Sequence, residues 1–363
     1  MKSRHFFVLS ALTIAASLTA CGGGSGSGSN TTPVSVGVGT APVTAPVTAP
    51  VTAPVTVVLP VTGAPINTAI VTTVVAANYA AGSEEQAAFN RLNAERGQCG
   101  FGLLTQAMQL DAAAKSHNDY QIINNTDSHF ENQTQFPRGF TGVRGIDRAI
   151  AKGYIDSGSV LDEFAIVLNK TDKTGFGDIG MRNLLNAPYH LAGLMDGNRD
   201  VGISVKSTIE TTPAGLSPAV FLHVNSSFKL ATGKQLINAD DVQTYPCQGS
   251  TGVSRQLTNE SPNPVPGRNL STDPIGTSIY VAARQGNPIT VASVSVKEAL
   301  TNTAVVMRAP ITESNDPNKA YKANEAYIAP NAPLKALTQY TATVTGTANG
   351  VAFSKTFSFT TGA

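Results

Sequence analysis

The chain has 363 residues, with 25 Lys and Arg against 24 Asp and Glu, so its formal net charge is +1. Only 13% of the residues are charged, which is about half of the usual share in a globular protein. Nucleic-acid phosphates demand clustered Lys and Arg, and this composition offers no such excess. No apolar run reaches the roughly 18 residues that a membrane-spanning helix needs. A basic nucleic-acid binder and a polytopic membrane protein are therefore excluded.

Residues 1–21 have the pattern of an export signal. Lys2 and Arg4 precede a short apolar stretch, and small residues follow it. This pattern predicts a cleaved signal peptide and not a membrane helix. Leu18-Thr19-Ala20-Cys21 resembles a bacterial lipobox, which implies that Cys21 is lipidated and becomes the mature N-terminus. We therefore expect an exported protein held to the envelope by a lipid anchor, on the outer membrane in a Gram-negative host; an ordinary signal peptide with an incidental cysteine is the alternative.

Residues 22–78 are predicted to form a tether. Gly/Ser repeats come first, and four copies of Ala-Pro-Val-Thr follow between residues 41 and 56. Gly/Ser segments are flexible coils, and a proline at every fourth position favours extended polyproline II. The segment has no aromatic residue before Tyr79, so it cannot bury a core. It would hold the following domain clear of a membrane.

Residues 79–258 read as an α+β domain. Ser83-Glu84-Glu85-Gln86 matches a capping box, and the apolar residues after it have helical spacing, which predicts a first helix. A second apolar stripe runs from Leu103 to His117, and residues 175–185 suggest another helix. Residues 199–208 and 219–228 alternate between apolar and polar side chains, as strands do. Helices followed by paired strands predict an α+β sandwich.

Several short motifs in this domain carry a resemblance to a known family. The stretch from Phe89 to Arg96 resembles the first-helix signature of the CAP superfamily of cysteine-rich secretory, antigen 5 and pathogenesis-related proteins, in its bacterial, SCP-like branch. Further matches follow in the family's order: Leu110 with Ala113, Ala114 and His117, then His129, Gly153-Tyr154, Glu163, Asn186 to His190, and Val201-Gly202-Ile203. The resemblance covers residues 79 to 247 and implies a three-layer α-β-α sandwich with an open cleft.

The family's cleft is lined by two histidines and one or two glutamates. Carried over by motif, these are His129, His190 and Glu163. The usual Gly-Glu-Asn is replaced by Asp162-Glu163-Phe164, and the chain has no Trp for the motif that precedes the last histidine. The second glutamate has no clear counterpart, and Glu131 could take its place.

Two imidazoles and a carboxylate make a three-ligand set for zinc, with a fourth position open for water. Such a site could support hydrolysis, with Glu163 or Glu131 as the general base. The alternative is a cluster of hydrogen-bonded polar residues on the cleft floor. His117 and His223 are interpreted as core histidines, and Arg144, Asp147 and Arg148 as a salt-bridged corner or as part of the cleft rim.

The remaining cysteines form an even pair. With Cys21 assigned to the anchor, Cys99 and Cys247 are left in an oxidising compartment, where a disulfide is expected. Two free thiols are the alternative.

Residues 259–363 begin with a Pro-rich seam, Asn259 to Pro266. Strand-like segments then recur, and Tyr340, Ala342 and Val344 share one face of theirs. The stretch from Ala329 to Thr361 resembles bacterial Ig-like domains, which implies a β-sandwich of about 100 residues.

Three functions are compatible with this sequence. The favoured hypothesis is a non-enzymatic module that binds a lipid, a peptide or another envelope component in the central cleft; lipid is suggested by the resemblance alone. A metal-assisted hydrolase that uses the His/Glu cluster is the second, and a structural surface protein with a vestigial cleft is the third.

Overall fold

The computed structural model describes residues 66–210 and 218–363. Its first half contains a four-stranded sheet in the order β1-β3-β4-β2, in which β4 is antiparallel to both neighbours and β1 is parallel to β3. The elements of this half are α1 (Glu84–Gln98), β1 (Thr105–Gln106), α2 (Met108–Asn124), α3 (Gly145–Ala151), β2 (Ser157–Leu168), α4 (Phe176–Asn186), α5 (Pro188–Met195), β3 (Asp200–Ser207) and β4 (Ala219–Lys229).

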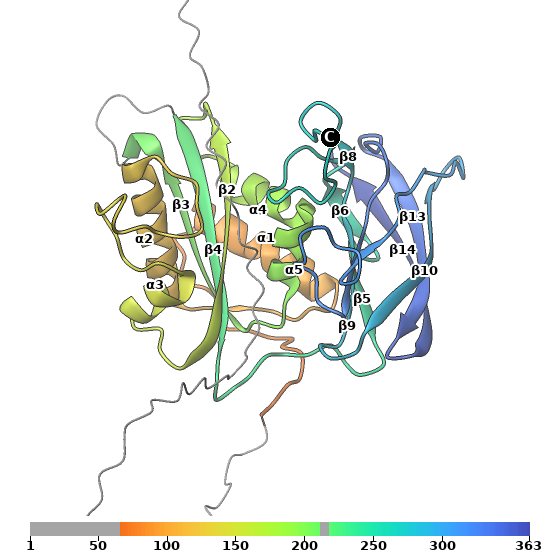
Figure 1. Ribbon diagram of the computed structural model, residues 1–363, viewed down its shortest axis with the longest axis horizontal. Coiled ribbons are helices and arrows are strands. Elements are labelled where there is room, and N and C mark those ends of the chain that lie inside the picture. The colour runs from red at the N-terminus through yellow and green to blue at the C-terminus, as the bar shows by residue number, and fades with distance from the viewer. Residues whose placement is uncertain (1–65, 211–217) are drawn as a thin grey trace, which may run out of the picture. The chain divides into compact units, whose positions relative to one another are not determined.

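Helices cover both faces of this sheet. Figure 1 shows α2 and α3 on one face and α1, α4 and α5 on the other, in agreement with the contacts between these elements. Because both faces are covered, the first nine residues of β4 are all buried, and β3 is nearly as buried. The combination of helices with mixed and antiparallel sheets confirms the predicted α+β class.

The first helix begins where its capping residues place it. Ser83 is the N-cap, and its hydroxyl accepts a hydrogen bond from the backbone N–H of Gln86 at 3.2 Å. The Gln86 side chain in turn accepts from the backbone N–H of Gly82 at 2.8 Å. These bonds satisfy donors that a helix N-terminus would otherwise leave open, so the local sequence alone determines this end.

The C-terminal end of the predicted tether is bonded to the folded domain. The backbone N–H of Leu236 donates to the carbonyl of Thr68 at 2.8 Å, and that of Leu103 donates to the carbonyl of Val71 at 2.8 Å. The buried Gln235 side chain accepts from the N–H of Val71 at 2.9 Å. Residues 66–71, assigned to the tether, are therefore bonded to the folded chain; the Ala-Pro-Val-Thr repeats, Cys21 and the export signal lie outside the described residues.

The second half is a pair of four-stranded sheets, β10-β13-β14-β6 and β11-β12-β9-β5, with a shared apolar core, and a small β7-β8 pair. Tyr340, Ala342 and Val344 are buried together, as their alternation predicts. The strands are β5 (Val242–Tyr245), β6 (Ser250–Val253), β7 (Gln256–Leu257), β8 (Ile275–Gly276), β9 (Ile279–Ala283), β10 (Ile289–Glu298), β11 (Ile311–Thr312), β12 (Glu325–Ile328), β13 (Gln339–Ala348) and β14 (Val351–Thr361).

The C-terminal sheets include residues that lie before the domain boundary expected after residue 258. β5 pairs with β9 and β6 pairs with β14, so residues 242–253 belong to the C-terminal sheets. One apolar core also runs from α1, α4 and α5 to Tyr280 and Tyr327 of the C-terminal strands. The two halves are joined by a common interior, which local composition does not reveal.

The predicted disulfide is confirmed. Cys99, the C-cap of α1, is bonded to Cys247, which lies between β5 and β6.

Within the described ranges, 66–210 and 218–363, no helix combines the length and the apolar character needed to cross a membrane.

Candidate functional site

The site is built on the edge strand of the first sheet. β2 has only β4 as a neighbour, and consecutive residues of a strand point to opposite faces. Asp162 points toward α2 and α3, where it contacts Arg148, and Glu163 points toward α5, where it contacts His190. The carboxylates of these two consecutive residues therefore lie on opposite faces of the sheet.

The three residues carried over from the family motifs converge. One donor atom from each of His129, Glu163 and His190 lies within 4.8 Å of the other two. Nε2 of His190 is 3.5 Å from Oε2 of Glu163, and the two imidazole centroids are 6.2 Å apart. Glu163 is buried, whereas 40% of the His129 side chain is exposed. The cluster thus has a buried side and a side open to solvent.

Each imidazole of the cluster has a second carboxylate beside its Nδ1. For His190 this is Glu260, whose Oε1 lies 2.9 Å from Nδ1. For His129 it is Asp162, whose Oδ2 lies 3.7 Å from Nδ1. Histidines that bind metals in proteins commonly have such an outer carboxylate, which sets the tautomer and the orientation of the ring.

A close approach of α5 to β2 brings His190 to Glu163. Gly193 lies one turn after His190, and a Cβ added there would be 2.6 Å from Oε1 of Glu163. Any larger residue would displace that carboxylate or push the helix away. The glycine therefore lets the helix pack onto the edge strand at the site.

Burial and neighbouring charge shift the proton affinities of this cluster. Burial raises the pKa of Glu163 to about 7, against the opposing effect of His190. Burial alone would lower the pKa of His190, but the carboxylates of Glu163 and Glu260 outweigh it and raise the pKa to about 9. Without a bound cation, the His190 ring is therefore protonated on both nitrogens at neutral pH, and this positive charge lies between the carboxyl groups of Glu163 and Glu260.

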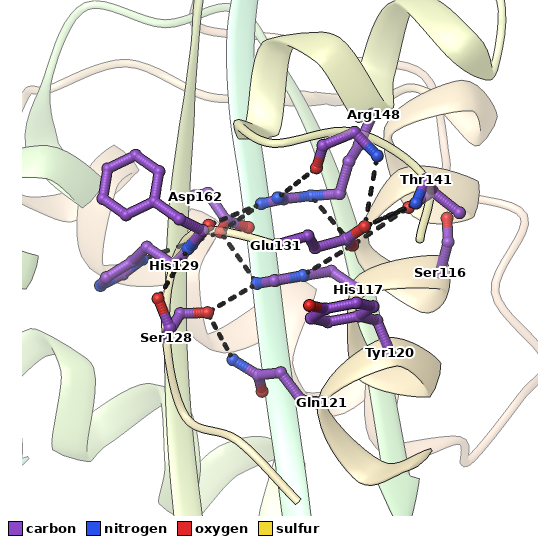
Figure 2. A network of polar contacts seen from close by, with 12 residues as sticks. Ser116, His117, Tyr120, Gln121, Ser128, His129, Glu131, Thr141, Arg148 and Asp162 are labelled. Carbon is purple, nitrogen blue, oxygen red and sulfur yellow. Dashed lines mark hydrogen bonds and ion pairs between the residues drawn. The ribbon is translucent and has the colours of Figure 1, made fainter. Parts of the chain in front are cut away.

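Glu131 does not belong to this cluster. Its carboxylate is buried on the other face of the sheet, where it lies 3.0 Å from Nδ1 of His117 and accepts hydrogen bonds from the backbone of Thr141 and Gly142 (Figure 2). Burial opposes its ionisation, but these bonds and Arg148 lower the pKa of Glu131. The expectation that it takes the place of the cleft's second glutamate is corrected: although Glu131 is only two residues from His129, the bonds to His117, Thr141 and Gly142 hold its carboxylate away from Glu163 and His190.

A second set of donor atoms, from His117, Asp162 and His223, also lies within 4.8 Å of one another. Figure 2 shows part of this group in the buried network around Arg148. The Arg148 guanidinium donates to Asp162 at 2.7 Å, and both side chains are buried. Since that guanidinium already neutralises Asp162, a second cation there would meet its repulsion. Burial lowers the pKa of His223 to about 4, so its ring is neutral, as expected of a core histidine.

The positions of the remaining predicted residues follow from this network. Arg148 is fully buried and ties α3 to β2, whereas Arg144 pairs with Asp147 at the exposed start of α3. The salt-bridged corner is therefore present, and its inner member reaches the site through Asp162. Glu260 is the residue that sequence reasoning missed, because it stands in the Pro-rich seam and has no local feature that separates it from a solvent-exposed glutamate.

No family model matches the chain, and no curated protein matches it. Among solved structures, it is similar to an outer surface protein of Borrelia burgdorferi at 14% identity and a TM-score of 0.31. That match covers 40% of this chain and 92% of the other. A TM-score this low does not establish a shared fold.

Proposed function

We propose that this chain is an exported, lipid-anchored envelope protein whose CAP-like domain binds a divalent metal ion, zinc in the first instance, through His129, Glu163 and His190. The observation that carries the proposal is the convergence of these three donors, which lie in separate segments of the chain. Support for a CAP-like domain comes from the order of its motifs and from helices on both faces of the sheet. The paired C-terminal sheets are compatible with an Ig-like module.

The residues present fit a zinc ion in the chemistry of their donors. Two imidazoles and one carboxylate are a ligand set used by zinc sites that keep one position open. The carboxylates Asp162 and Glu260 stand beside the Nδ1 atoms of the two histidines, where outer partners of metal ligands are found. A zinc ion bound there would supply Lewis acidity, which polarises a carbonyl group or favours ionisation of water.

The chain's own residues have distinct parts in this proposal. When it is ionised, Glu163 supplies a buried negative charge, which attracts a cation more strongly than an exposed carboxylate does. To bind a cation, His190 would lose the proton on Nε2 to solvent, while the proton on Nδ1 would stay hydrogen-bonded to Glu260. His129 lies on the solvent side and opens the site to an incoming group. Hydrolysis at this site, and a lipid, peptide or other envelope ligand in the cleft, stay predictions from the sequence.

Zinc titration tests the proposal. Isothermal titration calorimetry of the metal-free full chain should show one zinc ion per chain. The His129→Ala/His190→Ala double variant should lose this binding, and Glu163→Gln should weaken it, with circular dichroism to confirm folding. Glu313→Gln, at an exposed position of the C-terminal half, is the matched control and should titrate like the wild type. Equal heats for the wild type and the double variant would refute the metal site.

A further inference from the structure

The helix that carries His190 is held by residues of the C-terminal half. The Tyr189 hydroxyl donates to Oδ1 of Asp316 at 2.6 Å, and the Tyr321 hydroxyl donates to the carbonyl of Pro188 at 3.0 Å. Both bonds involve the first two residues of α5, immediately before His190. The position of the metal-site histidine thus depends on contacts that cross about 130 residues of sequence.

The seam between the two halves comes to the same helix. Asn318 donates to the carbonyl of Asn263 at 2.8 Å and to the Tyr189 hydroxyl at 2.8 Å, so one side chain links the seam to α5. At the start of the seam, Glu260 turns its carboxylate inward. Its side chain has no exposed surface, and its Oε1 lies 2.9 Å from Nδ1 of His190.

A buried carboxylate on Nδ1 determines what the other ring nitrogen can do. A neutral imidazole has a proton on one nitrogen and a lone pair on the other. When Glu260 holds the proton on Nδ1, the lone pair is on Nε2, which faces Glu163 at 3.5 Å. The carboxylate also makes the ring a better donor and prevents it from flipping.

We infer that Glu260 is a positioning residue of the metal site, supplied by the seam, which presents Nε2 of His190 to the cation. This inference rests on the proposed zinc site. It makes the C-terminal half a working part of that site, and not only a spacer beside it. The alternative is a purely structural role, in which Glu260 only holds the seam against α5. Its loss would then change the free energy of unfolding and leave zinc affinity unchanged.

Two substitutions separate these roles in the full chain. Glu260→Ala removes the carboxylate, and Glu260→Gln keeps the size and one acceptor oxygen but removes the charge. Zinc affinity should fall by about 10- to 100-fold in Glu260→Ala and by less in Glu260→Gln, as expected for outer partners of metal ligands. Glu313→Gln, an exposed glutamate to glutamine change, should have the wild-type affinity.

The ring nitrogen shifts of His190 in zinc-loaded protein provide a readout that a fastening role would not change. In ¹⁵N spectra the wild type and Glu260→Gln should show a protonated Nδ1 and a metal-bound Nε2. Glu260→Ala should show the reverse arrangement or a mixture. Thermal unfolding of each variant, followed by circular dichroism, verifies that it is folded at the temperature of the titration.

The outcomes distinguish a failure of the positioning role of Glu260 from a failure of the zinc site itself. If the wild type binds zinc and both Glu260 variants retain its affinity and its nitrogen shifts, the positioning role is overturned and the metal site stands. If the wild type binds no zinc, the proposed function fails and the inference fails with it. Weaker binding together with a changed tautomer in Glu260→Ala supports both.

Discussion

Nη2 of Arg148 donates to Oδ2 of Asp162 at 2.7 Å, and the two side chains are buried together on the face of the first sheet that α2 and α3 cover. Asp162 also lies 3.5 Å from His223 and 3.7 Å from both His117 and His129. Burial opposes its ionisation, but the histidines and Arg148 hold the pKa of Asp162 well below its usual range. This charged pair therefore links the core of one face to the outer histidine of the candidate metal site.

Asp162→Asn is expected to lower the free energy of unfolding by about 3–5 kcal/mol, because it leaves the Arg148 guanidinium buried without its counter-charge. Denaturant unfolding at neutral pH measures this change. The matched control is Asp273→Asn, which removes an ion-pair partner of Arg268 that is 67% exposed. Its cost should be about 1 kcal/mol or less. Similar costs at the two positions would show that Asp162 is not a buried counter-charge.

The disulfide between Cys99 and Cys247 closes a loop across 148 positions of sequence. In the chain-entropy treatment such a cross-link stabilises by about 5 kcal/mol, because it restricts the unfolded chain. The Cys99→Ser/Cys247→Ser variant should therefore melt well below the wild type in calorimetry. A reductant should lower the melting temperature of the wild type alone. If the melting temperature of the wild type stayed the same in reductant, the prediction would be contradicted.

Asp196 should contribute to stability in acid. Burial would raise its pKa, but Lys322 and Lys234 outweigh burial and lower the pKa to about 2, with Lys234 in contact at 2.6 Å. The folded pKa is depressed, so the stabilisation is present above about pH 4 and is lost as the pH falls toward 2. The shift corresponds to about 2 kcal/mol.

Asp196→Asn should accordingly reduce stability by about 2 kcal/mol at pH 7 and should lose less than the wild type between pH 5 and pH 2. Chemical unfolding at a series of pH values tests this, with the exposed Asp240→Asn as the matched substitution. Parallel curves for the wild type and Asp196→Asn would rule out the proposed linkage.

Lipid anchoring is testable at Cys21, which lies outside the described residues. If Cys21 is lipidated as proposed, Cys21→Ser should move the protein from the membrane fraction to the soluble fraction of a bacterial host, because it removes the thiol that would carry the lipid. Immunoblots of fractionated cells measure the distribution. Cys99→Ser, a cysteine to serine change elsewhere, should stay with the membrane. An unchanged distribution for Cys21→Ser would favour the ordinary signal peptide.

Local patterns in the sequence are sufficient for several elements. Ser83 and Gln86 predict the start of α1, and the alternation of Tyr340, Ala342 and Val344 predicts a buried strand face. These signals succeed because capping bonds and side-chain periodicity involve only residues a few positions apart. The family motifs likewise pointed to His129, Glu163 and His190, whose donor atoms the fold brings together.

Other features depend on contacts between distant segments. Glu260 meets His190 across 70 residues, and β5 and β6 pair with strands that follow much later in the chain. Glu131 illustrates the converse, since it is close to His129 in sequence but its carboxylate is buried against His117 and does not join the cluster of His129, Glu163 and His190. Residue spacing carries no information about which side of a strand a loop will reach. Burial and packing in the folded chain therefore decided which carboxylate lies beside which imidazole, and they also produced α3 and α5, which no local pattern indicated. Three helices, the strand faces and the cysteine pair could be predicted from the residues.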